Sequence, residues 1–277
     1  MKQPIAIVAG AGALPWEAAK ALAPRRHVIV LALEGEADCA NPPSGVESHA
    51  VGYGQIGRMR KILKANGCSE LLLLGAIRKR PDYGSILGDF ETLKLVPRIV
   101  RAAVGGDDTI VRNVLSLMES EGFSIVSIAD TVPELLAPAG RLGRHGPGEA
   151  HQADIALGNR FLDAAASFDI GQAAVVVDGR VIAVEGAEGT DAMVSRCKEL
   201  RAARRFRSAR GAGVLVKRPK VGQDMRADVP VVGAQTLTLV LEAGLGGIAV
   251  EAGRTIIAER EAMVAMADRA GAFVFAQ

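Results

Sequence analysis

The sequence of 277 residues lacks long hydrophobic runs, paired cysteines and strong charge of either sign. No run of about 18 apolar residues occurs, which argues against a transmembrane helix. The three cysteines, Cys39, Cys68 and Cys197, lie far apart and exclude both a disulfide framework and a CxxC metal site. A formal net charge of +2 does not require a nucleic-acid partner. The opening MKQPIAIVAGAG predicts a first strand and no signal peptide, so we expect a cytoplasmic protein.

Aromatic residues are also scarce, at 4%, whereas hydrophobic residues reach 49% and charged residues 23%. This composition is typical of a globular protein whose core is built from Ala, Val, Leu and Ile. In the first half, short apolar runs alternate with helical patterns, which predicts a parallel sheet covered by helices on both faces. The predicted strands are residues 5–9, 28–33, 71–74 and 124–128.

Prolines and glycines crowd into residues 133–148. Such a stretch cannot extend a helix or a central strand, so it indicates a boundary. We therefore predict an α/β protein of two domains. A Rossmann-like N-terminal domain with a parallel sheet covers residues 1–132, a linker covers residues 133–148, and a mixed α/β domain covers residues 149–277.

In the second half, two apolar runs flank Asp178-Gly179 and predict a β-hairpin of residues 173–177 and 181–184. Helical patterns and further short apolar runs continue to the C-terminus, which predicts a second α/β layer. The predicted helices cover residues 151–168, a segment from about Thr190, and residues 258–270, and the predicted strands lie near residues 214–216 and 248–250.

The first candidate binding loop, GAGALP, starts at Gly10, directly after the first predicted strand and before a helix. Backbone N–H groups and the helix dipole favour a phosphate at such a position. The loop resembles half of a dinucleotide fingerprint, and Glu34 after the second strand could receive a ribose hydroxyl. However, Pro15 replaces the third glycine, which normally allows close packing of helix on strand. A nicotinamide or flavin site, a different nucleotide and a plain turn stay open at this point.

A second candidate loop, GAIRKRP, covers residues 75–81 and follows the predicted strand 71–74. Ligands of open α/β folds bind at the carboxyl ends of parallel strands, and three successive cations there suit phosphates. A solvated basic loop is the alternative. In the loop GGDD, residues 105–108, capping of a helix is the expected role of the two aspartates.

Two charged stretches stand out in the second half. Residues 185–191, EGAEGTD, hold three carboxylates around Thr190, a natural N-cap, and could bind Mg²⁺, which prefers oxygen ligands. Residues 217–228, KRPKVGQDMRAD, supply the cations and carboxylates that phosphoryl transfer requires. Capping and surface ion pairs explain the same two patterns without a function.

Seven basic residues between Arg196 and Arg210 lie on and after a predicted helix. They predict either a solvated helix face or attraction to a diphosphate or to anionic lipid headgroups. The four histidines have no metal-ligand spacing, so we expect no catalytic role for them.

Several phrases, taken in order, resemble one family over nearly the whole chain: GAGALP, LLGAIRKRPDYGSILGDFETLKLVP, GGDD, DIGQAAVVVDGRVIAVEGAEGTDAM, VLVKRPKVGQDMRADVPVVGAQT and GLGGIAVEAGRTI. It is the UDP-2,3-diacylglucosamine pyrophosphatase family of lipid A biosynthesis, the type distinct from the calcineurin-like enzymes. The resemblance implies Mg²⁺-dependent hydrolysis of UDP-2,3-diacylglucosamine to 2,3-diacylglucosamine 1-phosphate (lipid X) and UMP, with Mn²⁺ as an alternative ion. The sequence has no DxH or GNHD metallophosphoesterase pattern and no Nudix-type acidic helix, which supports a distinct site.

The family's functional aspartate corresponds to Asp224, and the resemblance implies Lys217 and Gln223 as its catalytic neighbours. Asp224 would bind the metal ion or orient the attacking water, and Lys217 would offset charge on the phosphoryl oxygens. Glu188 and Asp191 are implied as further metal ligands. We expect the substrate to be bound by Gly10, Ala11, Gly12, Leu14, Gly75, Ala76, Lys79, Arg80, Thr190 and Arg226.

The acyl chains of this substrate reside in a membrane, so we expect peripheral contact with inner-membrane lipid and no nucleic-acid partner, and a homodimer stays open. Two alternative functions are each suggested by one motif. An NAD(P)- or FAD-dependent oxidoreductase is based on Gly10, Gly12 and Glu34, but Pro15 argues against it. A basic nucleic-acid or membrane adaptor is based on the run from Arg196 to Arg210, and the small net charge argues against it.

Overall fold

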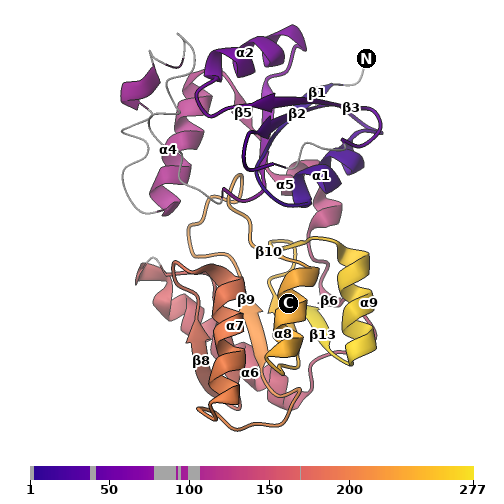
Figure 1. Cartoon of the computed structure of the whole chain (residues 1–277), viewed down its shortest axis with the longest axis vertical. Helices are drawn as coiled ribbons and strands as arrows, with labels where there is room; N and C mark the ends of the chain where they lie inside the picture. Colours follow the sequence, from indigo (N-terminus) through magenta and orange to yellow (C-terminus); the bar gives the residue numbers. More distant parts are fainter. Residues whose placement is uncertain (1–2, 38–41, 78–91, 93–94, 99–106, 169) are drawn as a thin grey trace. The chain divides into compact units, whose positions relative to one another are not determined.

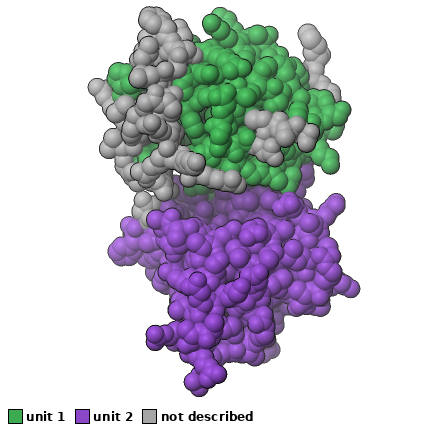
Figure 2. Space-filling model, in the orientation of Figure 1, with its two compact units in different colours: residues 1–133, 224–228 green, residues 134–223, 229–277 purple. Residues whose placement is uncertain are grey.

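The computed structural model describes residues 3–37, 42–77, 92, 95–98, 107–168 and 170–277. The chain divides into two compact units (Figures 1 and 2). Unit 1 comprises residues 1–133 together with residues 224–228, and unit 2 comprises residues 134–223 and 229–277. Both units combine a sheet with helices, which confirms the predicted α/β class. None of the described helices is long and apolar enough to cross a membrane.

Unit 1 is built on a parallel sheet with the strand order β3-β2-β1-β4-β5. Two inner strands, PIAIVA and HVIVLAL, are apolar apart from His27 and almost completely buried, as expected for a sheet with helices on both faces. The strands are β1 (Pro4–Ala9), β2 (His27–Leu33), β3 (Val46–Val51), β4 (Glu70–Leu74) and β5 (Ser124–Ile125).

Helices cover both faces of this sheet. An apolar cluster containing Ala6, Ile29 and Leu31 packs against side chains of helices α2 (Ile56–Ala65) and α4 (Asp107–Ser120). Helices α1 (Leu14–Leu22) and α5 (Ile128–Thr131) lie on the other face (Figure 1). The unit is therefore doubly wound, as the alternation of apolar runs predicted.

Two local predictions for unit 1 were wrong. The last predicted strand, residues 124–128, ends at Ile125, because Ser127 caps a helix that begins at Ile128. The Ser127 hydroxyl accepts a hydrogen bond from the Asp130 N–H at 3.1 Å, as a helix N-cap does. Strand β3 was not predicted, because its sequence VESHAV is polar and mostly half-exposed at the edge of the sheet.

Unit 2 contains a mixed sheet with the order β6-β13-β11-β9-β7-β8. Strands β13, β11 and β9 are parallel, whereas β6, β7 and β8 pair in antiparallel fashion. The strands are β6 (Gly140–Arg141), β7 (Ala173–Val177), β8 (Arg180–Val184), β9 (Val214–Lys217), β11 (Gly247–Val250) and β13 (Phe273–Ala276), and a separate parallel pair joins β10 (Val231–Val232) to β12 (Ile256–Ile257).

Three helices cover one face of this sheet and a fourth covers the other (Figure 1). Helices α7 (Gly189–Ala202), α8 (Ala234–Glu242) and α9 (Arg260–Ala270) pack side by side over one large apolar cluster. Helix α6 (Glu149–Ala165), followed by the short helix η3 (Ala166–Phe168), covers the opposite face. The last helix begins two residues later than predicted, because Glu259 before it adopts a left-handed conformation with φ 49°.

The predicted hairpin is confirmed, because β7 and β8 pair around Asp178 and Gly179, whose φ angles are 50° and 73°. Two successive left-handed residues match the right-handed twist of a hairpin. The residues predicted as a linker, 133–148, contain a short helix η2 (Pro133–Leu135) and strand β6, which pairs with β13 at the edge of the sheet. All of them after Pro133 group with unit 2.

Candidate functional site

The first predicted binding loops meet at the carboxyl ends of β1 and β4 in unit 1. The strand order reverses between these two strands, and ligands of open α/β sheets bind at such a point. The Gly10 N–H donates to the Leu74 carbonyl at 2.8 Å, and Ala11 and Ala76 exchange backbone hydrogen bonds of 2.8 and 3.1 Å. The structure therefore joins the loops at Gly10 and Gly75 into one backbone platform.

Only glycine fits at the centre of this platform. A Cβ atom on Gly10 would lie 2.6 Å from the Ala76 carbonyl oxygen, and one on Gly75 would lie 2.7 Å from the Gly10 carbonyl carbon. Gly12 is different, since it has a φ of 99° and no atom within 4 Å of the position of a Cβ. Gly12 and the buried Leu14 lead into α1, whose N-terminus follows the carboxyl end of β1.

Other predicted residues of unit 1 fall outside the described part of the chain. These include Lys79 and Arg80, so the predicted phosphate-binding cations have no described position. Glu34 follows β2 and is exposed, and its N–H donates to the Val51 carbonyl at 3.0 Å. Helix α4 begins at Asp107, but the structure does not describe the side chains of Asp107 and Asp108, so their capping role stays a prediction.

Asp224 lies in the short segment 224–228 that groups with unit 1. Its Oδ1 accepts hydrogen bonds from the backbone N–H and Nε of Arg226 at 3.1 and 3.0 Å, and its Oδ2 accepts one from Nη2 at 2.7 Å. Nη1 of Arg226 contacts Glu119 on α4 at 2.5 Å, and Ala227 packs against the apolar cluster of the sheet. The segment is therefore attached to unit 1 by both an ion-pair chain and an apolar contact.

The Asp224 carboxyl has a perturbed pKa. The hydrogen bonds from the Arg226 side chain lower this pKa below the ordinary value of an aspartate, although partial burial opposes the shift. Hydrogen bonds to Asp224 and Glu119 raise the pKa of Arg226 in return. Both side chains are therefore charged at neutral pH, and Asp224 presents a carboxylate whose exposed fraction is 20%.

Lys217 groups with unit 2, at the end of β9, and is only 7% exposed. Its Nζ donates a hydrogen bond of 2.8 Å to Oγ1 of Thr190, in the first turn of α7. Thr190 Oγ1 donates in turn to Oε1 of Glu185 at 2.7 Å, and Oε2 of Glu185 accepts the Gln172 N–H at 2.9 Å. Two predicted site residues, Lys217 and Thr190, are thus brought into direct contact.

The remaining predicted residues of unit 2 each have a contact of their own. Glu188 forms an ion pair of 3.3 Å with Arg196, and Oδ1 of Asp191 accepts a hydrogen bond of 2.9 Å from Thr236. Gln223 closes a turn, because its Oε1 accepts the Lys220 N–H at 2.7 Å. Its Nε2 also donates to Oε1 of Gln172 at 3.3 Å. Sequence patterns alone did not reveal any of these pairings.

The fit of a Mg²⁺ ion depends on these carboxylates. Among the described residues, no group of three or more His, Cys, Asp or Glu side chains is arranged to hold a metal ion. However, Mg²⁺ keeps several waters and often binds through one or two carboxylates together with substrate phosphates. Asp224 is ionised, but both of its oxygens accept hydrogen bonds from Arg226, so Asp224, Glu188 and Asp191 all stay predictions as metal ligands.

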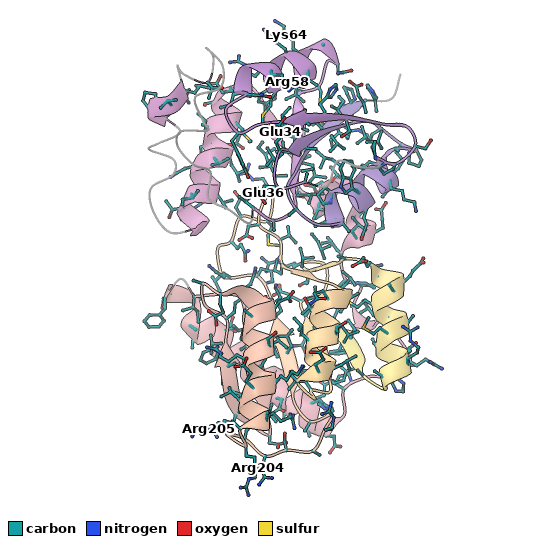
Figure 3. The ribbon with its side chains drawn as sticks, in the orientation of Figure 1. Glu34, Glu36, Arg58, Lys64, Arg204 and Arg205 are labelled. Atoms are coloured by element: carbon teal, nitrogen blue, oxygen red, sulfur yellow. The ribbon has the colours of Figure 1, made fainter. Side chains whose placement is uncertain are left out.

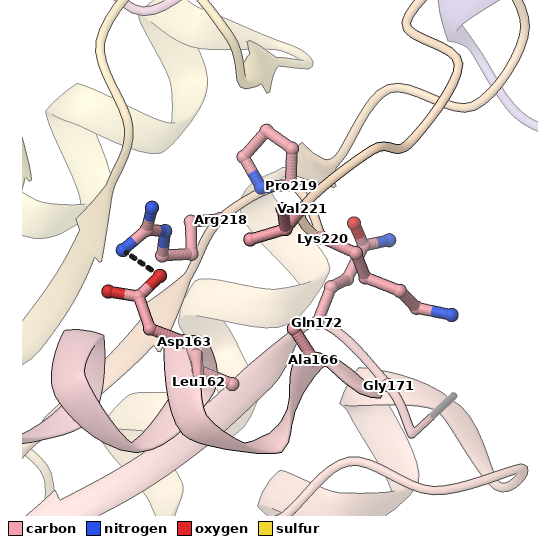
Figure 4. A pocket seen from close by; sticks show the side chains of 9 residues that line it. All are labelled: Leu162, Asp163, Ala166, Gly171, Gln172, Arg218, Pro219, Lys220 and Val221. Carbon is pink, nitrogen blue, oxygen red and sulfur yellow. Dashed lines mark ion pairs between the residues drawn. The ribbon is translucent and has the colours of Figure 1, made fainter. Parts of the chain in front are cut away.

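A pocket of unit 2, drawn in Figure 4, shares Gln172 with the Glu185 network. Arg218 at its wall forms an ion pair of 3.1 Å with Asp163 and a second of 3.3 Å with Glu251. Gln172 belongs to both sites, because it lines the pocket and its N–H donates to Glu185. The lining residues are Leu162, Asp163, Ala166, Gly171, Gln172, Arg218, Pro219, Lys220 and Val221.

Some arginines of the basic run around α7 make hydrogen bonds within unit 2, and others are exposed to solvent. Arg201 is held in place, since it donates to the carbonyls of Ala243 and Ser208 and lies 4.8 Å from the ring centre of Phe206. Arg204 and Arg205 point away from unit 2 into solvent (Figure 3). These two lie beyond the C-terminal end of α7, about 20 Å along the helix from Thr190 at 1.5 Å per residue.

Two family models together match nearly the whole chain. One is described as the LpxI N-terminal domain and matches residues 4–135, and the other is described as the LpxI C-terminal domain and matches residues 138–275. The chain is also 41% identical over 275 residues to the UDP-2,3-diacylglucosamine pyrophosphatase LpxI of Caulobacter vibrioides, covering 98% of this chain and 96% of that protein. These matches confirm the resemblance that the sequence motifs indicated, and they support neither the oxidoreductase nor the adaptor.

Proposed function

The chain belongs to the LpxI family, and on that premise we propose that it hydrolyses the pyrophosphate bond of UDP-2,3-diacylglucosamine. The products are 2,3-diacylglucosamine 1-phosphate (lipid X) and UMP. The observation that carries the proposal is the similarity to the named pyrophosphatase, because it extends over 98% of this chain and so includes both units. The geometry adds an ionised carboxylate in unit 1 and a buried cation in unit 2.

Asp224 is the proposed catalytic carboxylate. Its low pKa keeps it ionised, which suits a carboxylate that binds a cation or orients the attacking water. Arg226 holds both carboxylate oxygens and so fixes the orientation of the side chain. Lys217 supplies a positive charge that offsets the charge building on the phosphoryl oxygens. Gln223 precedes Asp224 and fixes the turn from which the catalytic segment departs.

The glycine platform of unit 1 is the proposed contact for the nucleotide end of the substrate. Gly10, Ala11, Gly75 and Ala76 bring the two loops together at the switch point, and there is open space beside Gly12 before the start of α1. A phosphate is favoured there by the helix dipole. Lys79 and Arg80 follow this platform in the sequence and are proposed to add positive charge.

We propose that hydrolysis requires Mg²⁺, or Mn²⁺ in its place. When bound, the ion would neutralise charge on the diphosphate oxygens and polarise the phosphorus that is attacked. Asp224 is the proposed ligand in unit 1. Glu188 and Asp191 would need to leave their present partners, Arg196 and Thr236, in order to serve as ligands.

Contact with the inner membrane is proposed because the acyl chains of the substrate reside there. The exposed arginines Arg204, Arg205 and Arg207 suit anionic headgroups, at about 1 kcal/mol for each basic residue near the surface. Their place at the far end of α7 from Thr190 indicates a role in attachment and not in catalysis. The cytoplasm is the compartment that this proposal requires.

The direct test is incubation of the purified chain with UDP-2,3-diacylglucosamine and Mg²⁺ in ¹⁸O-labelled water. We expect lipid X and UMP in equal amounts, and the family resemblance favours attack on the β-phosphorus, which places the label in lipid X. EDTA should stop the reaction, and Mg²⁺ or Mn²⁺ should restore it. Absence of both products, together with micromolar binding of NADH, would replace the pyrophosphatase with an oxidoreductase.

A further inference from the structure

Glu185 is a buried carboxylate at the edge of the unit 2 sheet. It directly follows β8, and its backbone continues the pairing with β7 through hydrogen bonds to Gly171 and Ala173. The residue is only 8% exposed. A Cβ atom on Gly171 would lie 2.3 Å from Cγ of Glu185, so the neighbouring backbone closes over this side chain. The carboxylate is therefore held in one place by the strand beside it.

The directions of the hydrogen bonds around Glu185 follow from the chemistry of the groups. An ionised carboxylate can only accept, so the single hydroxyl proton of Thr190 points to Glu185 Oε1. The ammonium of Lys217 can only donate, so Thr190 Oγ1 accepts from it. Because the Thr190 hydroxyl donates its proton to Glu185, its oxygen is left to accept from Lys217. All hydrogen bonds of the chain therefore run in one direction, from the ammonium through the hydroxyl to the carboxylate. Hydrogen bonds to charged groups are stronger than neutral ones, which makes this chain well defined.

A second buried carboxylate in unit 2 provides a comparison. Asp154 is 3% exposed, and its oxygens accept from the N–H groups of Asp178 and Gly179 at 3.1 and 2.7 Å. These bonds close the turn between β7 and β8 and involve no cation. One oxygen of Glu185 accepts the Gln172 N–H, and the other accepts the Thr190 hydroxyl, which in turn contacts Lys217. The two buried carboxylates therefore differ in role: Asp154 stabilises a turn, whereas Glu185 belongs to a hydrogen-bond chain that ends at a cation.

We propose that Glu185 is a positioning residue: through the Thr190 hydroxyl it fixes the ammonium of Lys217 where the diphosphate of the substrate is bound. This rests on the proposed function, because Lys217 acts on the phosphoryl oxygens there. Glu185 itself does not touch the substrate. Its removal takes away the acceptor of the Thr190 hydroxyl and so loosens one of the contacts that direct Lys217, and preorganised charge is what such sites rely on.

The experiment is a double-mutant cycle of Glu185→Gln and Thr190→Val, with Thr190→Ser and Asp154→Asn as matched controls. We expect each member of the cycle to lower kcat by about 20-fold with KM changed less than about threefold, the pattern of a lost transition-state contact. The double variant should lose little more than either single variant, because both break the same chain. Thr190→Ser keeps the hydroxyl and should retain clearly more kcat than Thr190→Val. Asp154→Asn, which changes a buried carboxylate elsewhere, should stay within about threefold of the parent.

Turnover by the unaltered chain is measured first and separates the two proposals. If the unaltered chain does not hydrolyse the substrate, the proposed function is refuted. If it does, a Glu185→Gln variant with kcat within about threefold of the parent overturns the positioning role. A double variant whose loss of kcat equals the product of the two single losses overturns it as well. Circular dichroism checks that each variant is folded. Should Glu185→Gln fail to fold, the kcat values of Thr190→Val and Thr190→Ser are compared instead. Equal values would refute the hydrogen-bond chain, because only Thr190→Ser keeps the hydroxyl.

Discussion

Asp224 and Arg226, two residues apart, hold each other in a bidentate ion pair in which Oδ1 accepts from Nε at 3.0 Å and Oδ2 from Nη2 at 2.7 Å. The same guanidinium reaches Glu119 on α4 through Nη1. The proposed catalytic carboxylate is thus attached to a helix of unit 1, although it lies more than a hundred residues later in the chain. This attachment leads to the first two predictions.

Replacement of Asp224 by Ala or Asn should lower turnover of UDP-2,3-diacylglucosamine by about a hundredfold or more, as loss of other preorganised electrostatic groups does. Substrate binding should persist, because the uridine, the sugar and the acyl chains provide most of the contact area. Initial rates and a binding isotherm with the intact substrate measure both effects. Rates within about fivefold of the parent, or about 1 kcal/mol in the barrier, would remove Asp224 from the mechanism and direct attention to Glu188 and Asp191.

Replacement of Arg226 by Met should raise the pKa of Asp224 toward its ordinary value, because the Arg226 hydrogen bonds are the largest cause of its lowering. A lowered pKa in the folded state adds stability above the unfolded value and loses it as the pH falls through the folded value. The parent should therefore exceed Arg226→Met in unfolding free energy by about 1 kcal/mol at pH 7, and by less at pH 3. Urea unfolding at both pH values measures the difference, and an equal difference at both would contradict the assignment.

Gly10→Ala should destabilise unit 1 more than Gly12→Ala does. A Cβ on Gly10 would press on backbone atoms of Gly75 and Ala76, and overpacking of this kind costs about 1–3 kcal/mol. At Gly12 the space is open, and only the left-handed backbone opposes alanine, at about 1 kcal/mol. Thermal unfolding of both variants gives the order. A Gly10→Ala protein as stable as the Gly12→Ala protein would mean that the two loops separate easily.

Attachment to anionic vesicles should depend on the end of α7. Combined replacement of Arg204, Arg205 and Arg207 by Ala should abolish sedimentation with vesicles, and salt should weaken binding of the parent. Combined replacement of Arg58, Lys61 and Lys64 on α2 removes the same charge from another exposed surface and is the matched control (Figure 3). Equal loss in both triple variants would show that net charge, and not this surface, attracts the protein.

Cys68 and Cys197 should stay unmodified in the folded protein at pH 8. Burial raises the pKa of the Cys197 thiol to about 11 and also raises the pKa of Cys68, so almost no reactive thiolate is present. A Cys39→Ser variant limits the experiment to these two thiols. Peptide mapping after exposure to iodoacetamide should find label only when urea is added, and rapid labelling without urea would show that the buried sites open.

The sequence by itself determined the elements and the family. Continuous apolar runs such as residues 28–33 predicted buried parallel strands, and Asp178-Gly179 predicted the hairpin, because these signals depend on neighbours along the chain. The motifs likewise indicated the family that the comparisons confirm. Where a local signal was weak, as in the polar edge strand Val46–Val51, the prediction missed the element.

Only the tertiary structure decided which charged residues meet. The stretch 217–228 is one continuous phrase in the sequence, yet Lys217 groups with unit 2 and Asp224 with unit 1. Likewise, the sequence does not distinguish Glu185 from the two acidic residues near it. In the fold, Glu185 is buried against Thr190, which contacts Lys217 across a separation of 27 residues. Charged side chains carry no periodic signal of their partners, because a salt bridge or a hydrogen bond depends on distance in space. That distance is set by how the apolar strands and helices pack, and so the roles of these charges follow from the fold.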